Sequence, residues 1–261
     1  MEYEPSQETN KVIEEKITQV AAALTSSSSE NLVNAKRDLI SGQGNLGQGN
    51  LRKNQLEIEQ DLRTLLKRID EGLEEIFKMA QQLQSFEPEI FSQEAMQGIT
   101  YLIQNVWEFK KITLDSLLDL EKNEPIKNLL SISNHAAAAI YRASTQIYNE
   151  GRFKEAASAF TVVTLLDASL HDGWVALGNA EVFCKRPKSA LVAYALAAIS
   201  QPANPTSHLL AAQCYETLKE YSLALNSLEI AQKMLSDDPQ QTDLVKKAEE
   251  HKQHLLKLME K

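Results

Sequence analysis

Small and large apolar residues recur with one period in the C-terminal half of the chain. Ala156, Ala190 and Ala224 are spaced at intervals of 34 residues. A small residue stands twelve positions before each alanine, and a large one stands four positions after it (Ser144, Gly178 and Ala212; Phe160, Tyr194 and Leu228). Two antiparallel helices approach closely where a small residue faces a large one. Each period therefore predicts a pair of packed helices.

This period is that of the tetratricopeptide repeat, a helix–turn–helix unit that stacks into a curved solenoid. We predict an all-α fold with a repeat domain over 125–261, in three units at about 137–170, 171–204 and 205–238 and a closing helix over 239–260. The closing helix is apolar on one face and rich in lysine and glutamate on the other, as the end of a solenoid requires. An ordinary array of helical hairpins with coincidental spacing is the alternative.

A second apolar pattern, with heptad spacing, precedes the repeats. It runs through residues 51–87 (Leu62, Leu66, Ile69, Leu73, Ile76, Ala80 and Leu83) and predicts a long helix that ends before Pro88. A second helix is expected from about Ser92 to Leu120, so that 51–124 forms a helical hairpin or coiled-coil-like region. Ile58, Leu65 and Phe77 widen the apolar face, which favours packing within the chain over pairing in a homodimer, the alternative.

The first 50 residues show weaker patterns, and we expect 1–50 to be flexible or partly helical. Residues 11–24 could form one amphipathic helix, and Ser27–Glu30 fits a capping box for a short second helix that ends near Ile40. Residues 41–50 contain four of the nine glycines of the chain, which is typical of a flexible linker.

Composition excludes several classes of function. The net charge is −9 and no block of lysine and arginine occurs, which argues against a nucleic-acid partner. No apolar run reaches transmembrane length and the N-terminus lacks the features of a signal peptide, so we expect an intracellular protein without membrane insertion. Only two cysteines occur, and Cys184 and Cys214 are predicted to be small core residues in a reducing compartment.

No motif for catalysis, phosphate binding or a cofactor is present, so we expect a binding protein and not an enzyme. His251 and His254 lie three residues apart on the predicted closing helix and could both reach a metal ion. Because no third ligand of the zinc type is adjacent in sequence, surface histidines are favoured and no metal is expected.

The first helix of each repeat is expected to line the concave surface through its second, fifth, ninth and twelfth positions. We predict a peptide-binding site there (Tyr141, Thr145, Tyr148, Phe153, Val175, Asn179, Val182, Phe183, Leu209 and Gln213). Aromatic and aliphatic groups can anchor an extended apolar peptide, while the amides can satisfy its backbone. Repeat domains that clamp acidic tails have lysine and asparagine where Tyr141 and Thr145 stand here, so an acidic tail is disfavoured.

Three stretches of the repeat region carry a closer resemblance: Ile140–Phe160, Trp174–Gly178 with Ala190 and Tyr194, and His208–Tyr215 with Ala224. Together they resemble class II chaperones of bacterial type III secretion, the LcrH/SycD-like translocator chaperones, over roughly residues 130–260.

This resemblance implies a chaperone of the bacterial cytoplasm, without a cofactor, that holds an extended segment of a hydrophobic translocator or effector in the concave groove before export. Tyr141, Tyr148 and Phe153 match groove positions of the family, with Asn179 and Gln213 as partners of the peptide backbone. About 130 residues precede the repeats, which is unusual for the family. A scaffold or regulatory component of a multiprotein secretion complex is the alternative function.

Overall fold

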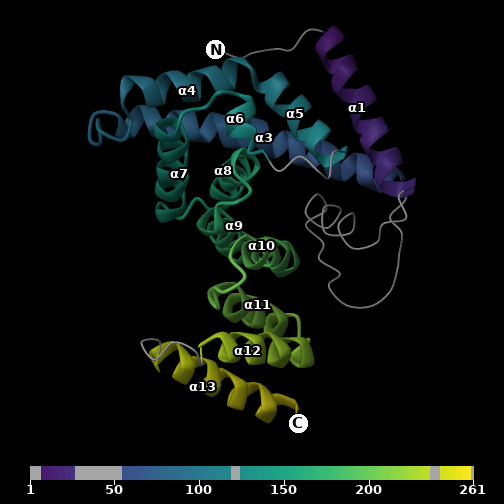
Figure 1. Cartoon of the computed structure of the whole chain (residues 1–261), viewed down its shortest axis with the longest axis vertical. Coiled ribbons are helices and arrows are strands. Elements are labelled where there is room, and N and C mark those ends of the chain that lie inside the picture. The colour runs from purple at the N-terminus through teal and green to yellow at the C-terminus, as the bar shows by residue number, and fades with distance from the viewer. Residues whose placement is uncertain (1–6, 27–54, 119–123, 236–241, 260–261) are drawn as a thin grey trace. The chain divides into compact units, whose positions relative to one another are not determined.

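The computed structural model describes residues 7–26, 55–118, 124–235 and 242–259, and every regular element in these ranges is a helix (Figure 1). The predicted all-α class is therefore confirmed. The short helix expected to end near Ile40, the glycine-rich linker and the turn at Asp238-Pro239 lie outside the described residues. The chain forms two compact units, Met1–Ser169 and Leu170–Lys261.

Helices of the first unit are α1 (Gln7–Ser26), α3 (Gln55–Leu83), α4 (Gln93–Gln104), α5 (Val106–Leu118), α6 (Ile126–Leu129), α7 (Asn134–Asn149) and α8 (Phe153–Leu166). Those of the second unit are α9 (His171–Phe183), α10 (Pro187–Ser200), α11 (Thr206–Thr217), α12 (Tyr221–Leu235) and α13 (Thr242–Met259). The pairs α7–α8, α9–α10 and α11–α12 each pack together as the two helices of one repeat.

Helix α3 is the long helix that the heptad pattern predicts. Its stripe is buried from Leu62 to Ala80 and partly buried at Leu83. It packs against α1, α4, α5, α7 and α8 of the same chain, so the wide apolar face serves intramolecular packing. Figure 1 shows α1 and α5 beside one end of α3 and α4 beside the other.

The second expected helix is interrupted, which corrects the prediction of one helix from Ser92 to Leu120. Helix α4 ends at Gln104 and α5 starts at Val106, with Asn105 between them at φ −116° and ψ 30°. The Asn105 side chain donates a hydrogen bond to the carbonyl oxygen of Tyr101 at 2.9 Å. Asparagine side chains compete in this way with the helical hydrogen-bond ladder.

Helix α8 lies at the centre of the first unit. Every residue from Ala156 to Thr164 is buried, and α3, α6 and α7 all pack against this helix. Gly72 of α3 makes this packing close, because a Cβ there would lie 2.4 Å from the carbonyl oxygen of Ser158. Helix α8 also has no charged side chain between Ala156 and Leu166, as expected of a helix surrounded on all sides.

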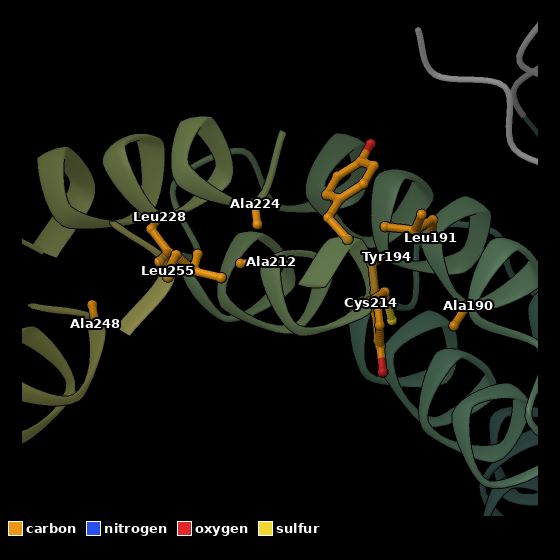
Figure 2. Close-up of a cluster of buried hydrophobic side chains, with 10 residues drawn as sticks. Ala190, Leu191, Tyr194, Ala212, Cys214, Ala224, Leu228, Ala248 and Leu255 are labelled. Carbon is orange, nitrogen blue, oxygen red and sulfur yellow. The ribbon is translucent and has the colours of Figure 1, made fainter. Parts of the chain in front are cut away.

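The second unit shows the predicted pairing of small and large residues. A Cβ at Gly178 of α9 would lie 2.3 Å from Cε1 of Tyr194 on α10, so the ring lies directly on the glycine. Figure 2 shows the core of this unit, to which α13 contributes Ala248 and Leu255. The last helix thus buries its apolar face against the repeats that precede it.

Candidate functional site

The first helices of the three repeats, α7, α9 and α11, each keep one accessible face. Every position predicted to face a ligand is at least partly exposed (Ala138, Tyr141, Thr145 and Tyr148; Asp172, Val175, Asn179 and Val182; Thr206, Leu209, Gln213 and Glu216). Their spacing of three or four residues puts the positions of each helix on one side of it.

An aromatic cluster forms the accessible face of the first unit. The ring centroid of Tyr148 lies 5.2 Å from that of Phe153 and 6.4 Å from that of Phe160, both in edge-to-face arrangements. Tyr141 lies 6.1 Å from Phe160, which is fully buried. Burial also raises the pKa of the Tyr148 hydroxyl. Tyr141, Tyr148 and Phe153 therefore pack on the core with part of each side chain and present the rest to the surface.

Thr145 belongs to the same face but its hydroxyl is already engaged. Its Oγ1 donates a hydrogen bond to the carbonyl oxygen of Tyr141 at 2.9 Å, within the helix. This bond to the preceding turn is common for threonine in helices and directs the hydroxyl toward the backbone. Thr145 contributes mainly its methyl group to the surface.

Helix α9 carries the most exposed apolar side chains of the predicted site. Val182 is 42% exposed and Phe183 is 56% exposed, while Val175 is partly buried. The Oδ1 atom of Asn179 accepts a hydrogen bond from the Tyr194 hydroxyl at 2.8 Å. This bond holds the carboxamide in place through its oxygen, so Asn179 can offer its NH₂ group to a peptide carbonyl.

Helix α11 continues the accessible face with Leu209, partly exposed, and Gln213, exposed. Its next position, Glu216, bonds to α13. The Glu216 carboxylate lies 2.6 Å from Nε2 of His251 and 3.3 Å from Nε2 of His254. The last helix thus closes the end of this face.

These contacts correct one prediction on the histidines. His254 is 57% exposed, but the His251 side chain is only 19% exposed and is not a solvated surface group. Although Glu216 brings a carboxylate beside the pair, no group of three or more such side chains arranged to hold a metal ion is found in the described part of the chain.

The cysteines are both free, and they differ in environment. Cys214 is buried, and this burial raises the pKa of its thiol to about 11. Cys184 is only partly buried, so the expected core position holds for Cys214 alone. A thiol with so high a pKa is almost wholly protonated at neutral pH and is a poor nucleophile.

Sequence reasoning missed two contacts that shape these faces. The bond from Tyr194 to Asn179 could have been suspected, because a buried tyrosine hydroxyl needs a partner. The contact of Glu216 with the histidines of α13 had no comparable signal, since 35 residues separate Glu216 from His251. Among the described helices, none is long and apolar enough to cross a membrane.

Known proteins are similar to this chain in structure and not in sequence. No model of a protein family and no curated protein matches it. A type III secretion complex from Aeromonas hydrophila matches with a TM-score of 0.52 at 20% identity, over 54% of this chain and 94% of that one. The matched half of this chain therefore resembles in fold a chain of this secretion complex.

Two further crystal structures are of this kind. The translocator chaperone SycD of Yersinia enterocolitica matches with a TM-score of 0.48 at 20% identity, over 51% of this chain and 99% of SycD. PcrH, bound to the chaperone-binding region of PopD, matches with a TM-score of 0.44 at 17% identity, over 54% of this chain and 99% of PcrH. Each of the three likenesses leaves nearly half of this chain unmatched.

Proposed function

We propose that this protein is a chaperone of a bacterial type III secretion system, which holds an extended apolar segment of a translocator or effector until export. The segment would lie on the accessible faces of α7, α9 and α11. The observation that carries the proposal is that all twelve positions predicted to face a ligand are at least partly exposed, and that most of them are apolar, aromatic or amide-bearing.

The chemistry of these faces favours an extended and apolar client. Tyr148 and Phe153 provide rigid ring surfaces, and Val182 and Phe183 provide exposed apolar ones. Asn179 and Gln213 can bond to a peptide backbone that would otherwise lose its hydrogen bonds to water. The class of client follows the structural neighbours, among which PcrH is bound to a region of the translocator PopD.

Co-expression with a translocator from the same bacterium tests this function. Phe183→Ala removes an exposed anchor and should weaken the complex by about 2 kcal/mol, roughly thirtyfold in dissociation constant. Phe86→Ala is the matched control, because Phe86 is 81% exposed and lies between α3 and α4, outside the three helices that carry the predicted positions. The amount of soluble translocator and the affinity for its N-terminal peptide are measured. Equal binding by both variants would disprove the assignment of the site.

The pair Tyr141→Ala and Tyr148→Ala extends this test to the first unit. Both rings contact the buried Phe160, so the fold of this double variant must first be verified by circular dichroism and thermal unfolding. If it remains folded, the proposal requires that it no longer rescues the co-expressed translocator.

A scaffold or regulatory role within a secretion complex is the second candidate. It is favoured by the extent of the N-terminal helices. Helices α1, α3 and α5 pack against one another ahead of the repeats and bury Ile17, Val20, Ile58 and Phe109. If partner capture survives both Phe183→Ala and the double tyrosine variant, and is lost on charge reversal in α1 or α5, the scaffold role is preferred.

A further inference from the structure

The second helices of the three repeats, α8, α10 and α12, differ in the residues on one side, which we call the outer stripe. In α8 this stripe is Ser158, Val162 and Leu165; in α10 it is Val192, Leu196 and Ile199; in α12 it is Asn226, Ile230 and Lys233. These residues occupy equivalent positions of the 34-residue period, at i, i+4 and i+7, and so lie on one side of each helix.

The outer stripe of α8 is covered by helix α3. A Cβ at Gly72 would lie 2.4 Å from the Ser158 carbonyl oxygen and 2.9 Å from Cγ2 of Val162. The Ser158 hydroxyl donates to Glu71 at 3.2 Å, and Glu75 forms an ion pair with Arg152, which precedes α8. The partner of this stripe is thus a helix with a small residue at the closest approach and a glutamate three residues later.

The outer stripe of α10 is wholly aliphatic, and its end is open. Ile199 is 67% exposed, Leu196 is partly exposed and Val192 is buried. A large aliphatic side chain exposed at the end of an apolar stripe is a candidate anchor for a partner helix. The stripe of α10 is more apolar than that of α8, although the stripe of α8 is the one that a helix, α3, already covers.

Basic residues at the start of α10 match those at the start of α8. Arg186 and Lys188 stand where Arg152 and Lys154 stand in the preceding repeat. The Arg186 side chain is 43% exposed, with its Nε atom 2.7 Å from Oε2 of Glu181, and Lys188 is exposed. Arg152, which pairs with Glu75 in the first repeat, therefore has an equivalent in the second repeat, Arg186.

The third repeat lacks both features. Two of the three residues in its outer stripe, Asn226 and Lys233, are polar and exposed. Glu220 occupies the position of Arg186, and Ser222 that of Lys188. The aliphatic stripe and its basic end thus occur together in the second repeat and are absent together from the third.

We propose that the outer stripe of α10 binds an amphipathic helix of a partner protein, in the way that α8 binds α3. The partner helix presents a small residue toward Leu196 and carries an acidic residue three positions later, toward Arg186 and Lys188. The outer stripe belongs to α10, whereas the client-facing positions of the same unit belong to α9 and α11, so the protein can hold a client and a second partner at once.

A peptide with the sequence of residues 55–83, the α3 sequence, is the probe. It is labelled with a fluorophore and added to the full-length protein, whose own α3 already covers α8. We expect saturable binding by fluorescence anisotropy, weakened at least tenfold by Ile199→Glu. Ile230→Glu is the matched control, because Ile230 is the equivalent of Leu196 in the third repeat and is 37% exposed. A peptide with Gly72→Leu should bind at least tenfold more weakly.

Lys188→Glu tests the electrostatic part of the proposal without changing an apolar residue of the stripe. Its side chain is exposed, so the substitution leaves folding intact, and it should weaken the peptide more at low salt than at high salt. Absence of saturable binding would overturn the proposal, and so would binding unaffected by both Ile199→Glu and Lys188→Glu. Affinity for a translocator peptide should be the same in these variants and in the native protein.

Discussion

The contact of Gly178 with Tyr194 links the packing of the second unit to its proposed binding face. The ring lies on the glycine, and its hydroxyl donates to Asn179 one residue further along α9. A change in the position of this ring therefore also moves the Asn179 amide. Packing and the proposed peptide recognition thus depend on the same side chain, that of Tyr194.

Gly178→Ala should lower the free energy of unfolding by about 1–3 kcal/mol, because the new methyl group overlaps the Tyr194 ring. Urea denaturation followed by circular dichroism measures this change. Tyr194→Phe is the control that keeps the ring and removes the bond to Asn179, and it should cost about 1 kcal/mol. An alanine variant as stable as the native protein would mean that the ring moves aside without cost.

His208 predicts how stability depends on pH. This side chain of α11 is half-buried, and burial lowers its pKa below the usual value of 6.5. As the pH falls through 6.5, the unfolded chain binds a proton at His208 before the folded one does, so stability falls with pH in that range. His208→Gln should therefore lose less stability than the native protein between pH 7.5 and pH 5.5 in parallel urea titrations. Equal losses would contradict the assigned environment.

The sequence predicted the residue positions better than their partners. The 34-residue period assigns Gly178, Tyr194 and Asn179 to faces, but a period does not show which polar group bonds to which. The period likewise predicted Tyr148 as ligand-facing, and the family resemblance added Phe153, whereas the structure shows that both rings also pack in the aromatic cluster of Tyr148, Phe153 and Phe160. A side chain at the edge of a core can serve both roles, and only coordinates show how it is shared.

At the scale of helices, α3 and α8 define the first unit. The charge-free run from Ala156 to Leu166 is a sequence signal that α8 is buried on every side. The covering helix could not be identified from that run, because Gly72 and Ser158 are far apart in sequence and many amphipathic helices could fit.

The sequence also did not reveal the interruption between α4 and α5 at Asn105. The apolar pattern continues across Asn105, while the bond from its side chain to the Tyr101 carbonyl redirects the backbone.

Gly72→Ala tests the close approach of α3 and α8. A Cβ there meets backbone atoms of Ser158, which cannot rotate away, so the two helices must separate. We expect a loss of about 1–3 kcal/mol in stability and faster amide hydrogen exchange in α8. Glu74→Ala, at a position that is 66% exposed on the same helix, should leave the exchange of α8 unchanged. Unaltered exchange in both variants would contradict the packing described.

At the scale of the whole molecule, the N-terminal helices are part of the first repeat's structure. Removal of residues 1–132 would expose the outer stripe of α8 and the surface of α7 that faces α3 and α4. Buried aliphatic surface exposed in this way drives association.

A chain of residues 133–261 should therefore aggregate or bind the dye ANS, whereas a chain of residues 51–261, which retains α3, should stay soluble with α8 covered. Size-exclusion chromatography and dye fluorescence distinguish the two. A stable, monomeric 133–261 fragment would show that α3 is dispensable for the repeats.

The pairing of α3 with α8 also has a consequence during synthesis. The side chains of Glu71 and Ser158 meet across 87 residues of sequence. At roughly 5–20 residues per second, the ribosome needs about 4–17 s to make the chain between them. Throughout that interval the apolar side of α3 has been synthesised and its main partner has not. Nascent chains of this protein should consequently be captured by ribosome-associated folding factors for longer than chains whose first helices pair with their immediate neighbours.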